Sequence, residues 1–274
     1  MIRYFTAGES HGPTLTGIIE GVPAGLQIKE ADIAEHLARR QKGYGRGGRM
    51  AWEKDIARID SGVRFGKTMG GPIAMVIQNR AFKKDKADWP VVMNKEVEAK
   101  GIEKITLPRP GHADLVGAQK FRFNDIRPVI ERSSARETSM RVACGSVARQ
   151  FLKQFGIEIG GHVLRIGAAG YNDWDQIREK TASFMESGAE SLYRAADLSE
   201  VRCLDAKLTR QMVNEIKTYR KAGSSLGGVY EVIVTGVPVG LGSYTHWDRK
   251  IDGKLAQAVL STQAMKGVEI GLIG

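Results

Sequence analysis

Cysteine is almost missing from this sequence, which carries only Cys144 and Cys203 in 274 residues. A chain with so few cysteines has no disulfide framework, so we expect it to work in the reducing cytoplasm. Long apolar runs are missing too. None approaches the ~20 residues of a membrane-spanning helix, and the N-terminal MIRYFTAGESHG lacks the apolar core of a signal peptide.

Complete motifs for metal and nucleotide binding are also absent. No two histidines lie four residues apart, as a zinc-binding helix would require, so we expect no metal. Gly43, Gly45 and Gly48 fit the dinucleotide pattern G-x-G-x-x-G, but they follow an expected helix instead of a strand. The GKT at 66–68 resembles the end of a phosphate-binding loop, yet Ser61 stands where the first glycine belongs. These patterns argue against Rossmann and P-loop proteins.

What the chain does have is positive charge. Lys and Arg number 41 and Asp and Glu number 31, which gives a net charge of +10. This excess suggests an acidic partner such as nucleic acid, an anionic membrane or a small polyanion. Hydrophobic residues make up 42% of the chain, enough to bury a large core in one or two domains.

Apolar periodicity and turn residues predict a chain that mixes helices and strands. We expect strands at 1–7, 14–20, 56–63, 72–78, 157–166 and 229–235. We expect helices at 29–40, 205–222 and 254–265, and a longer one that Gly156 ends. Segments 80–104 and 172–195 are polar and are expected to be exposed.

The longer helix is the clearest in the sequence. Ser133 or Ser134 can cap its start, with Glu137 completing a capping box. Its apolar stripe comprises Met140, Cys144, Val147, Ala148, Phe151, Leu152 and Phe155. The preceding segment reads as a loop with four arginines, Arg122, Arg127, Arg132 and Arg136. A capped helix start beside arginines suits an anion, although an ordinary surface helix with solvated arginines would look similar.

Residues 8–26 repeat at 223–241. The two segments align without gaps and share eight of nineteen residues, including Gly-Val-Pro-x-Gly-Leu. A helix is expected after each copy. We therefore expect two similar halves, with the chain ending inside the second.

Two histidines and several arginines stand in glycine-rich turns. His11 lies in GESHG and His112 in RPGHAD, and an exposed imidazole can act as a general acid. Gathered around one pocket, the arginines would bind a small molecule with several anionic groups. They fall into three groups: Arg40, Arg46 and Arg49; Arg109; and Arg127, Arg132 and Arg136.

In their order along the chain, these motifs resemble the chorismate synthase family. They are GESHG, RRQKGYGRGGRM, SGVRFGKTMGGPI, RPGHAD, ERSSARETSMRVACG and KLAQAVLSTQAMKGVEIG. The resemblance implies one α+β domain over 1–274, a βαβ sandwich with an internal pseudo-two-fold repeat, assembled as a homotetramer. Members of the family continue well past this C-terminus, so the second half is expected to be incomplete here and the domain C-terminally truncated.

The resemblance also implies an activity. The family converts 5-enolpyruvylshikimate 3-phosphate to chorismate by 1,4-elimination of phosphate, a step of the shikimate pathway toward aromatic amino acids. It needs reduced FMN although no net redox change occurs, and NADPH is a candidate reductant. A small-molecule substrate is thus expected, and neither nucleic acid nor a membrane.

Residue roles follow from the family motifs. His11 matches the histidine that protonates the departing phosphate, and His112 matches one near the flavin. Positions that match substrate contacts are Ser10, Arg40, Arg46, Arg109 and the helper Arg49; Arg40 and Arg46 also match NADPH contacts. Positions that match flavin contacts are Arg132, Ser133, Ser134, Gln263 and Ala264.

Two other functions remain open from the residues alone. A non-catalytic basic module that binds RNA or another polyanion would explain the charge and the Gly-Arg loop. The third hypothesis is a flavin reductase that uses NADPH and does not catalyse the elimination of phosphate, although no separate nicotinamide motif is present.

Overall fold

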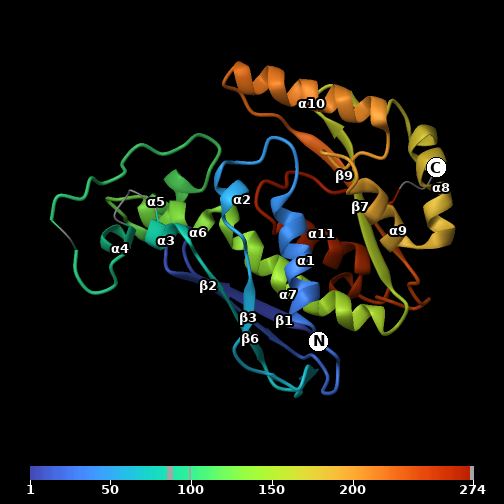
Figure 1. Ribbon diagram of the computed structural model, residues 1–274, viewed down its shortest axis with the longest axis horizontal. Coiled ribbons are helices and arrows are strands. Elements are labelled where there is room, and N and C mark those ends of the chain that lie inside the picture. Colours follow the sequence, from blue (N-terminus) through green and yellow to red (C-terminus); the bar gives the residue numbers. More distant parts are fainter. Residues whose placement is uncertain (85–88, 99, 272–274) are drawn as a thin grey trace. The chain divides into compact units, whose positions relative to one another are not determined.

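A computed structural model describes residues 1–84, 89–98 and 100–271 (Figure 1). The chain divides into two compact units. Unit 1 comprises Met1–Arg40, Asp55–Ala148 and Gly240–Gly274, and unit 2 comprises Gln41–Lys54 and Arg149–Val239. Both units mix helices with antiparallel sheet. The single domain expected over 1–274 stays a prediction.

Unit 1 is built on a four-stranded antiparallel sheet in the order β1-β2-β6-β3. Its strands are β1 (Arg3–Ala7), β2 (Thr14–Glu20), β6 (Ile73–Gln78) and β3 (Ala57–Ile59). Buried and more exposed residues alternate along β2 and β6, as the two-residue period of a strand requires. The buried side chains of these two central strands are Leu15, Ile19, Ile73, Met75 and Ile77.

Helix α7 (Thr138–Lys153) packs against β2. A Cβ atom added to Gly17 would lie 2.5 Å from Sδ of Met140 and 3.0 Å from Sγ of Cys144. Only glycine allows helix and strand to approach so closely. The predicted apolar stripe is confirmed in its first half, whereas Phe155 at its end is exposed.

Shorter elements complete unit 1. Helix α1 (Glu30–Gln41) buries Ile33 and Leu37. The small hairpin is β4 (Val63–Arg64) and β5 (Lys67–Thr68). The remaining helices are α3 (Ala81–Lys84), α4 (Trp89–Val92), α5 (Asp114–Phe121), α6 (Arg127–Ser133), the 3₁₀ turns η1 (Ala135–Glu137) and η2 (Trp247–Arg249), and α11 (Ile251–Leu260).

Unit 2 contains a three-stranded sheet in the order β8-β7-β9. Its strands are β7 (Glu158–Ile166), β8 (Ala169–Gly170) and β9 (Gly228–Thr235). Its helices are α2 (Arg49–Trp52), α8 (Trp174–Ser187), α9 (Ala189–Ala196) and α10 (Ala206–Lys221). Asp205 caps α10 by accepting hydrogen bonds from the backbone of Lys207 and Leu208. The core residues are Leu164, Tyr171, Ile177, Val201, Cys203, Met212 and Val213.

Most of the predicted elements are confirmed. The strands at 1–7, 14–20, 72–78, 157–166 and 229–235 and the helices at 29–40 and 205–222 match within a few residues. The strand expected at 56–63 is broken into β3 and β4, and the last helix ends at Leu260, before Met265. Both cysteines are free, as expected, and Cys144 is buried as its place on the apolar stripe predicts; Cys203 is buried too.

Three expectations are wrong. The segment 122–136, expected as a loop, contains helix α6. Segment 172–195 was expected to be exposed; this holds for most of α8 but fails for α9, which buries Ala189, Leu192 and Tyr193 on one face. The expected capping box is absent, because Ser134 caps η1 and Glu137 bonds other side chains. In 80–104, short helices α3 and α4 form, and residues 85–88 and 99 lie outside the described residues.

The two copies of the sequence repeat share local structure. Residues 14–20 form β2, and the aligned residues 229–235 lie in β9. The matched glycines adopt similar left-handed backbones, with φ of 81° at Gly21 and 72° at Gly236. The pseudo-two-fold sandwich remains a prediction. No described helix is both long and apolar enough to cross a membrane.

Candidate functional site

His11 lies in the turn that joins β1 to β2, and a buried carboxylate holds it. Its ring Nδ1 is 2.8 Å from Oε1 of Glu131, and its backbone N–H donates to Oε2 of the same residue at 2.7 Å. Trp89 stacks on the imidazole with the ring centroids 3.8 Å apart. Asn79 supports the same turn by donating to the carbonyls of Glu9 and Gly12.

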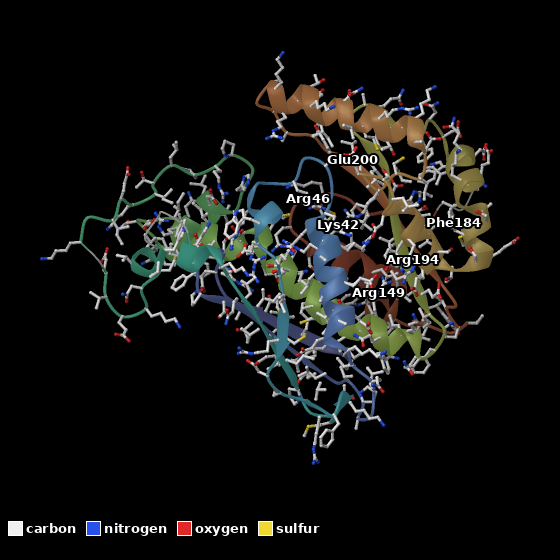
Figure 2. All side chains as sticks on the ribbon, in the orientation of Figure 1. Lys42, Arg46, Arg149, Phe184, Arg194 and Glu200 are labelled. Carbon is white, nitrogen blue, oxygen red and sulfur yellow. The ribbon has the colours of Figure 1, made fainter. Side chains whose placement is uncertain are left out.

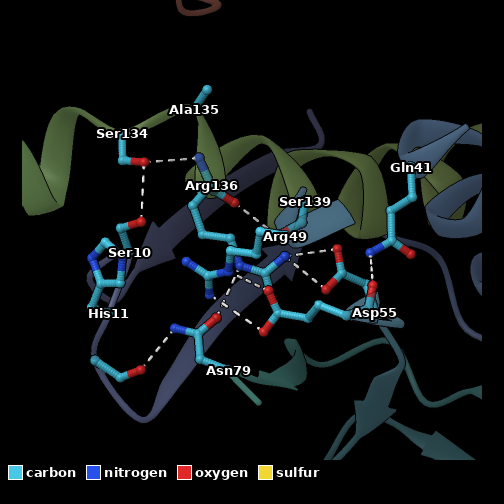
Figure 3. A network of polar contacts seen from close by, with 12 residues as sticks. Ser10, His11, Gln41, Arg49, Asp55, Asn79, Ser134, Ala135, Arg136 and Ser139 are labelled. Carbon is cyan, nitrogen blue, oxygen red and sulfur yellow. Dashed lines mark hydrogen bonds and ion pairs between the residues drawn. The ribbon is translucent and has the colours of Figure 1, made fainter. Parts of the chain in front are cut away.

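Ser10 and Ser134 connect this turn to the start of α7 (Figure 3). The Ser134 hydroxyl donates to the Ser10 hydroxyl at 3.2 Å and accepts the backbone N–H of Arg136. The Ser10 backbone N–H donates to the carbonyl of Glu131. Two predicted site residues that are 124 residues apart in the sequence thus meet. Ser133 is the last residue of α6 and is half-buried.

A buried ionic network holds the turn between α6 and α7. Arg136 donates to both carboxylate oxygens of Asp55 and to Oδ1 of Asn79. Arg40 donates to Oγ1 of Thr138 and to the carbonyl of Ala135, and it lies 3.6 Å from Asp55. Each nitrogen of the Arg40 guanidinium therefore has a protein partner. In this structure Arg40 ties α1 to the start of α7.

Arg132 contacts the end of β1 and the turn that follows it. Its guanidinium donates to the carbonyls of Thr6 and Gly8 and to the Thr6 hydroxyl, at 2.7 to 3.3 Å. The side chain remains exposed, so the donors left over face water. An anion beside the start of α7 would find these donors.

Gln263 and Ala264 follow α11, and Gln263 meets the same helix start. Its Nε2 donates to Glu137 at 2.9 Å, and Glu137 also accepts from Thr6 and Arg141. Burial alone would raise the pKa of Glu137, but these hydrogen bonds together lower the pKa below its ordinary value. The Gln263 Oε1 is buried without a hydrogen-bond partner among the described residues. Ala264 has a left-handed backbone, with φ of 70°.

Arg109 and His112 lie in the turn before α5. Arg109 makes a two-pronged ion pair with Asp114, at 2.8 and 3.0 Å. The hydrogen bond from Arg109 lowers the pKa of the buried Asp114 to about 2, against the opposing effect of burial. His112 is exposed, and its Nδ1 lies 3.0 Å from the carbonyl of Pro110. Among the described residues, no hydrogen bond or ion pair links these two side chains to His11.

Arg46 and Arg49 belong to unit 2. Arg46 lies in the glycine-rich loop and lines a hollow of about 440 Å³, together with Tyr44, Glu200 and residues of the loop itself. Figure 2 labels Arg46 and Glu200. Burial, and then the charge of Arg202, lower the pKa of Arg46. Arg49 pairs with Glu53 one helical turn later. Whether these two arginines join the residues of unit 1 stays a prediction.

The site contains residues that the sequence analysis missed. Glu131 contacts His11, Asp55 pairs with Arg136, and Asn79 supports the His11 turn. Glu137, expected only in a capping box, accepts a hydrogen bond from Gln263. The available signal was a carboxylate placed directly after the apolar pair Val129-Ile130. Charged residues are rarely buried without a partner, but the sequence does not name the partner.

Comparison with known proteins gives a consistent result. A family model described as chorismate synthase matches residues 2–273. A chorismate synthase of Salinibacter ruber is 55% identical over 274 residues, covering 99% of this chain and 68% of the relative. One of Chlorobium luteolum is 54% identical, with 99% and 67% covered. A solved structure titled "Crystal Structure of Chorismate Synthase" has a TM-score of 0.79 and 42% identity, and the match covers 99% of this chain and 69% of that one.

Proposed function

The chain belongs to the chorismate synthase family of lyases in aromatic amino acid biosynthesis, and we infer that it carries out the reaction of that family. It would remove phosphate from 5-enolpyruvylshikimate 3-phosphate by 1,4-elimination and so form chorismate. The observation that carries this conclusion is the match of one family over residues 2–273, at 51–55% identity to relatives of that name.

The reaction balances without net oxidation. A C–H bond breaks and releases a proton, the C–O bond to phosphate breaks, and the phosphate leaves with that electron pair. A new carbon–carbon double bond forms. Phosphate leaves more readily when it is protonated, and this is the role we assign to the imidazolium of His11.

The substrate carries two carboxylates and a phosphate, so several cationic donors are needed to hold it. We assign this work to Ser10, Arg46, Arg49 and Arg109. Arg40 is proposed to contact substrate and NADPH as well, and it also holds the turn 134–138 through its contacts with Ala135 and Thr138. The guanidinium has five N–H donors and these two hydrogen bonds use two of them, so the same side chain can also donate to substrate or NADPH.

Reduced FMN is the cofactor we propose, and the residues present suit it. The unpaired Gln263 Oε1 can accept a hydrogen bond from a flavin ring N–H, and Arg132 has donors for an anionic group. Ser133, Ser134 and Ala264 would complete the contacts. When bound, the reduced flavin supplies electron density that the elimination draws on transiently. His112 is proposed to lie near it.

Three further properties belong to the proposal. A homotetramer, a cytoplasmic location and NADPH as the source of reducing equivalents are expected from the family. Light scattering on the purified protein tests the first of these directly, because a tetramer has four times the mass of the 30.0 kDa chain.

An anaerobic assay tests the activity. The 274-residue protein is mixed with reduced FMN and 5-enolpyruvylshikimate 3-phosphate, and both chorismate absorbance and released phosphate are followed. Equal amounts of the two products support the function. Flavin-dependent oxidation of NADPH without either product would favour the reductase instead, and salt-sensitive binding of RNA without turnover would favour the polyanion-binding module.

A further inference from the structure

Glu131 is a buried carboxylate for which the activity described so far has no use. Its side chain is 2% exposed, whereas the His11 side chain beside it is 28% exposed. A buried carboxylate is unfavourable unless its oxygens are satisfied by hydrogen bonds. Here both carboxylate oxygens form hydrogen bonds with His11: Oε1 bonds the ring Nδ1, and Oε2 accepts the backbone N–H.

This arrangement selects a tautomer of His11. A carboxylate only accepts hydrogen bonds, so the ring nitrogen that faces it, Nδ1, must carry a proton. The Nε2 atom is then the ring nitrogen left to exchange a proton with another molecule. The backbone contact anchors the main chain at the same point, so the ring and its support are held by a single carboxylate.

The remaining surroundings restrict the ring further. Trp89 of α4 covers one face of the imidazole, with an angle of 13° between the planes. The Arg127 guanidinium lies 5.9 Å from the Trp89 ring, and Arg132 binds the carbonyls of Thr6 and Gly8. Among the described residues, Glu131 is the carboxylate hydrogen-bonded to the imidazole, and Arg127 and Arg132 lie on the same helix α6.

We propose that Glu131 is a positioning residue that fixes the His11 imidazole with Nδ1 protonated, so that Nε2 delivers the proton to the leaving phosphate. This proposal rests on the proposed function of His11. The imidazolium gives its Nε2 proton to a phosphate oxygen as the C–O electron pair leaves with the phosphate. The neutral ring keeps its other proton on Nδ1, held by Glu131, and regains a proton from solvent before the next turnover.

The first measurement needs no variant and no activity. Long-range ¹⁵N–¹H correlation spectra of the wild-type protein, taken where His11 is neutral, should show the Nδ1–H tautomer. Free imidazole side chains favour the proton on Nε2, so that tautomer in the wild-type ring would overturn the proposal. The same spectra of Glu131→Ala should show His11 returning toward Nε2–H.

The second measurement is kinetic. With saturating reduced FMN, Glu131→Gln should lower kcat at least tenfold, a part of the roughly 10²–10⁴-fold that a positioned general acid contributes. KM should change less than kcat, and the pH profile of kcat should change shape, because the group that transfers the proton is altered. Glu131→Asp keeps the charge and should recover part of the loss. Exposed Glu103→Gln is the matched control and should leave kcat unchanged.

The outcomes separate the two claims. If the wild type makes no chorismate, the proposed function fails, and the tautomer measured on the same sample still decides whether Glu131 fixes the ring. If the wild type is active and Glu131→Gln keeps full kcat with an unchanged pH profile, the positioning role is wrong. Should Glu131→Gln not fold, Glu131→Asp and the wild-type spectrum decide.

Discussion

Arg136 and Asp55 lie 81 residues apart in sequence and form a buried ion pair, with Nη1 of Arg136 at 2.7 and 2.8 Å from the two carboxylate oxygens. Arg136 follows Ser134 in the turn that meets Ser10, so this pair supports the region where several predicted site residues gather. The sequence suggested an anion-binding arginine at this position. In the structure the Arg136 guanidinium binds the carboxylate of Asp55 inside unit 1.

Removing Asp55 should therefore destabilise the protein. Asp55→Ala leaves the Arg136 charge buried without its counter-ion, and losing one partner of such a pair lowers the free energy of unfolding by about 3–5 kcal/mol. Chemical denaturation followed by circular dichroism measures this. Asp60→Asn breaks the exposed pair with Arg58 and should leave unfolding unchanged. Equal effects of both variants would contradict the assignment.

Gly17 and Gly145 form a second matched pair. Gly17→Ala places a methyl group against Met140 and Cys144, so we expect a loss of about 1–3 kcal/mol from overpacking. Gly145 lies on the exposed side of α7 with no atom within 4 Å of an added Cβ. Gly145→Ala should stabilise by up to about 1 kcal/mol through helix propensity. Thermal unfolding of the two variants should shift in opposite directions.

His11→Ala tests the proposed proton donor. We expect kcat for chorismate formation to fall by about 10²–10⁴-fold, because the phosphate would leave without a positioned acid. Substrate KM should change little, since the arginines still bind the anionic groups. His246→Ala removes an exposed histidine paired with Asp248 and should retain full activity. A His11→Ala enzyme with wild-type kcat would place the acid elsewhere.

Gln263→Ala tests the proposed flavin contact. Loss of one hydrogen bond should weaken the binding of reduced FMN by about tenfold, the equivalent of roughly 1.4 kcal/mol. Anaerobic titration of flavin absorbance gives the dissociation constant without any need for turnover. Gln257→Ala, an exposed change on α11, provides the control. An unchanged dissociation constant for Gln263→Ala would remove Gln263 from the flavin site.

The pair of Arg109 and Asp114 predicts a pH dependence of stability. The pKa of Asp114 is lowered from 3.8 to about 2 in the folded protein. The folded state therefore binds this proton less readily than the unfolded state, and the pair stabilises the fold above pH 3.8. That contribution should disappear as the pH falls toward 2. Wild type should exceed Asp114→Asn in stability near neutral pH, and denaturation curves of the two should converge in acid.

The amino-acid sequence alone determined the elements whose signals are local. The alternation in 14–20 predicted β2, the apolar stripe from Met140 to Val147 predicted the buried face of α7, and the helix expected at 205–222 corresponds to α10. These signals depend on period and on capping within a few residues, so no distant partner is needed to interpret them. The family motifs predicted the function in the same way, because the identity of their residues and their order along the chain can be compared without knowing the fold.

Tertiary structure alone decided which residues pair. Glu131 and His11 are 120 residues apart, and the local sequence around Glu131 does not show that His11 is its partner. The hydrogen bonds of Arg40 to Ala135 and Thr138, 95 and 98 residues away, could not be predicted from the sequence either. Helix α9 was missed because its four buried residues are interleaved with polar ones and gain their burial only by packing in unit 2. Ion pairing and burial depend on chain segments brought together by folding, and a linear pattern does not specify them.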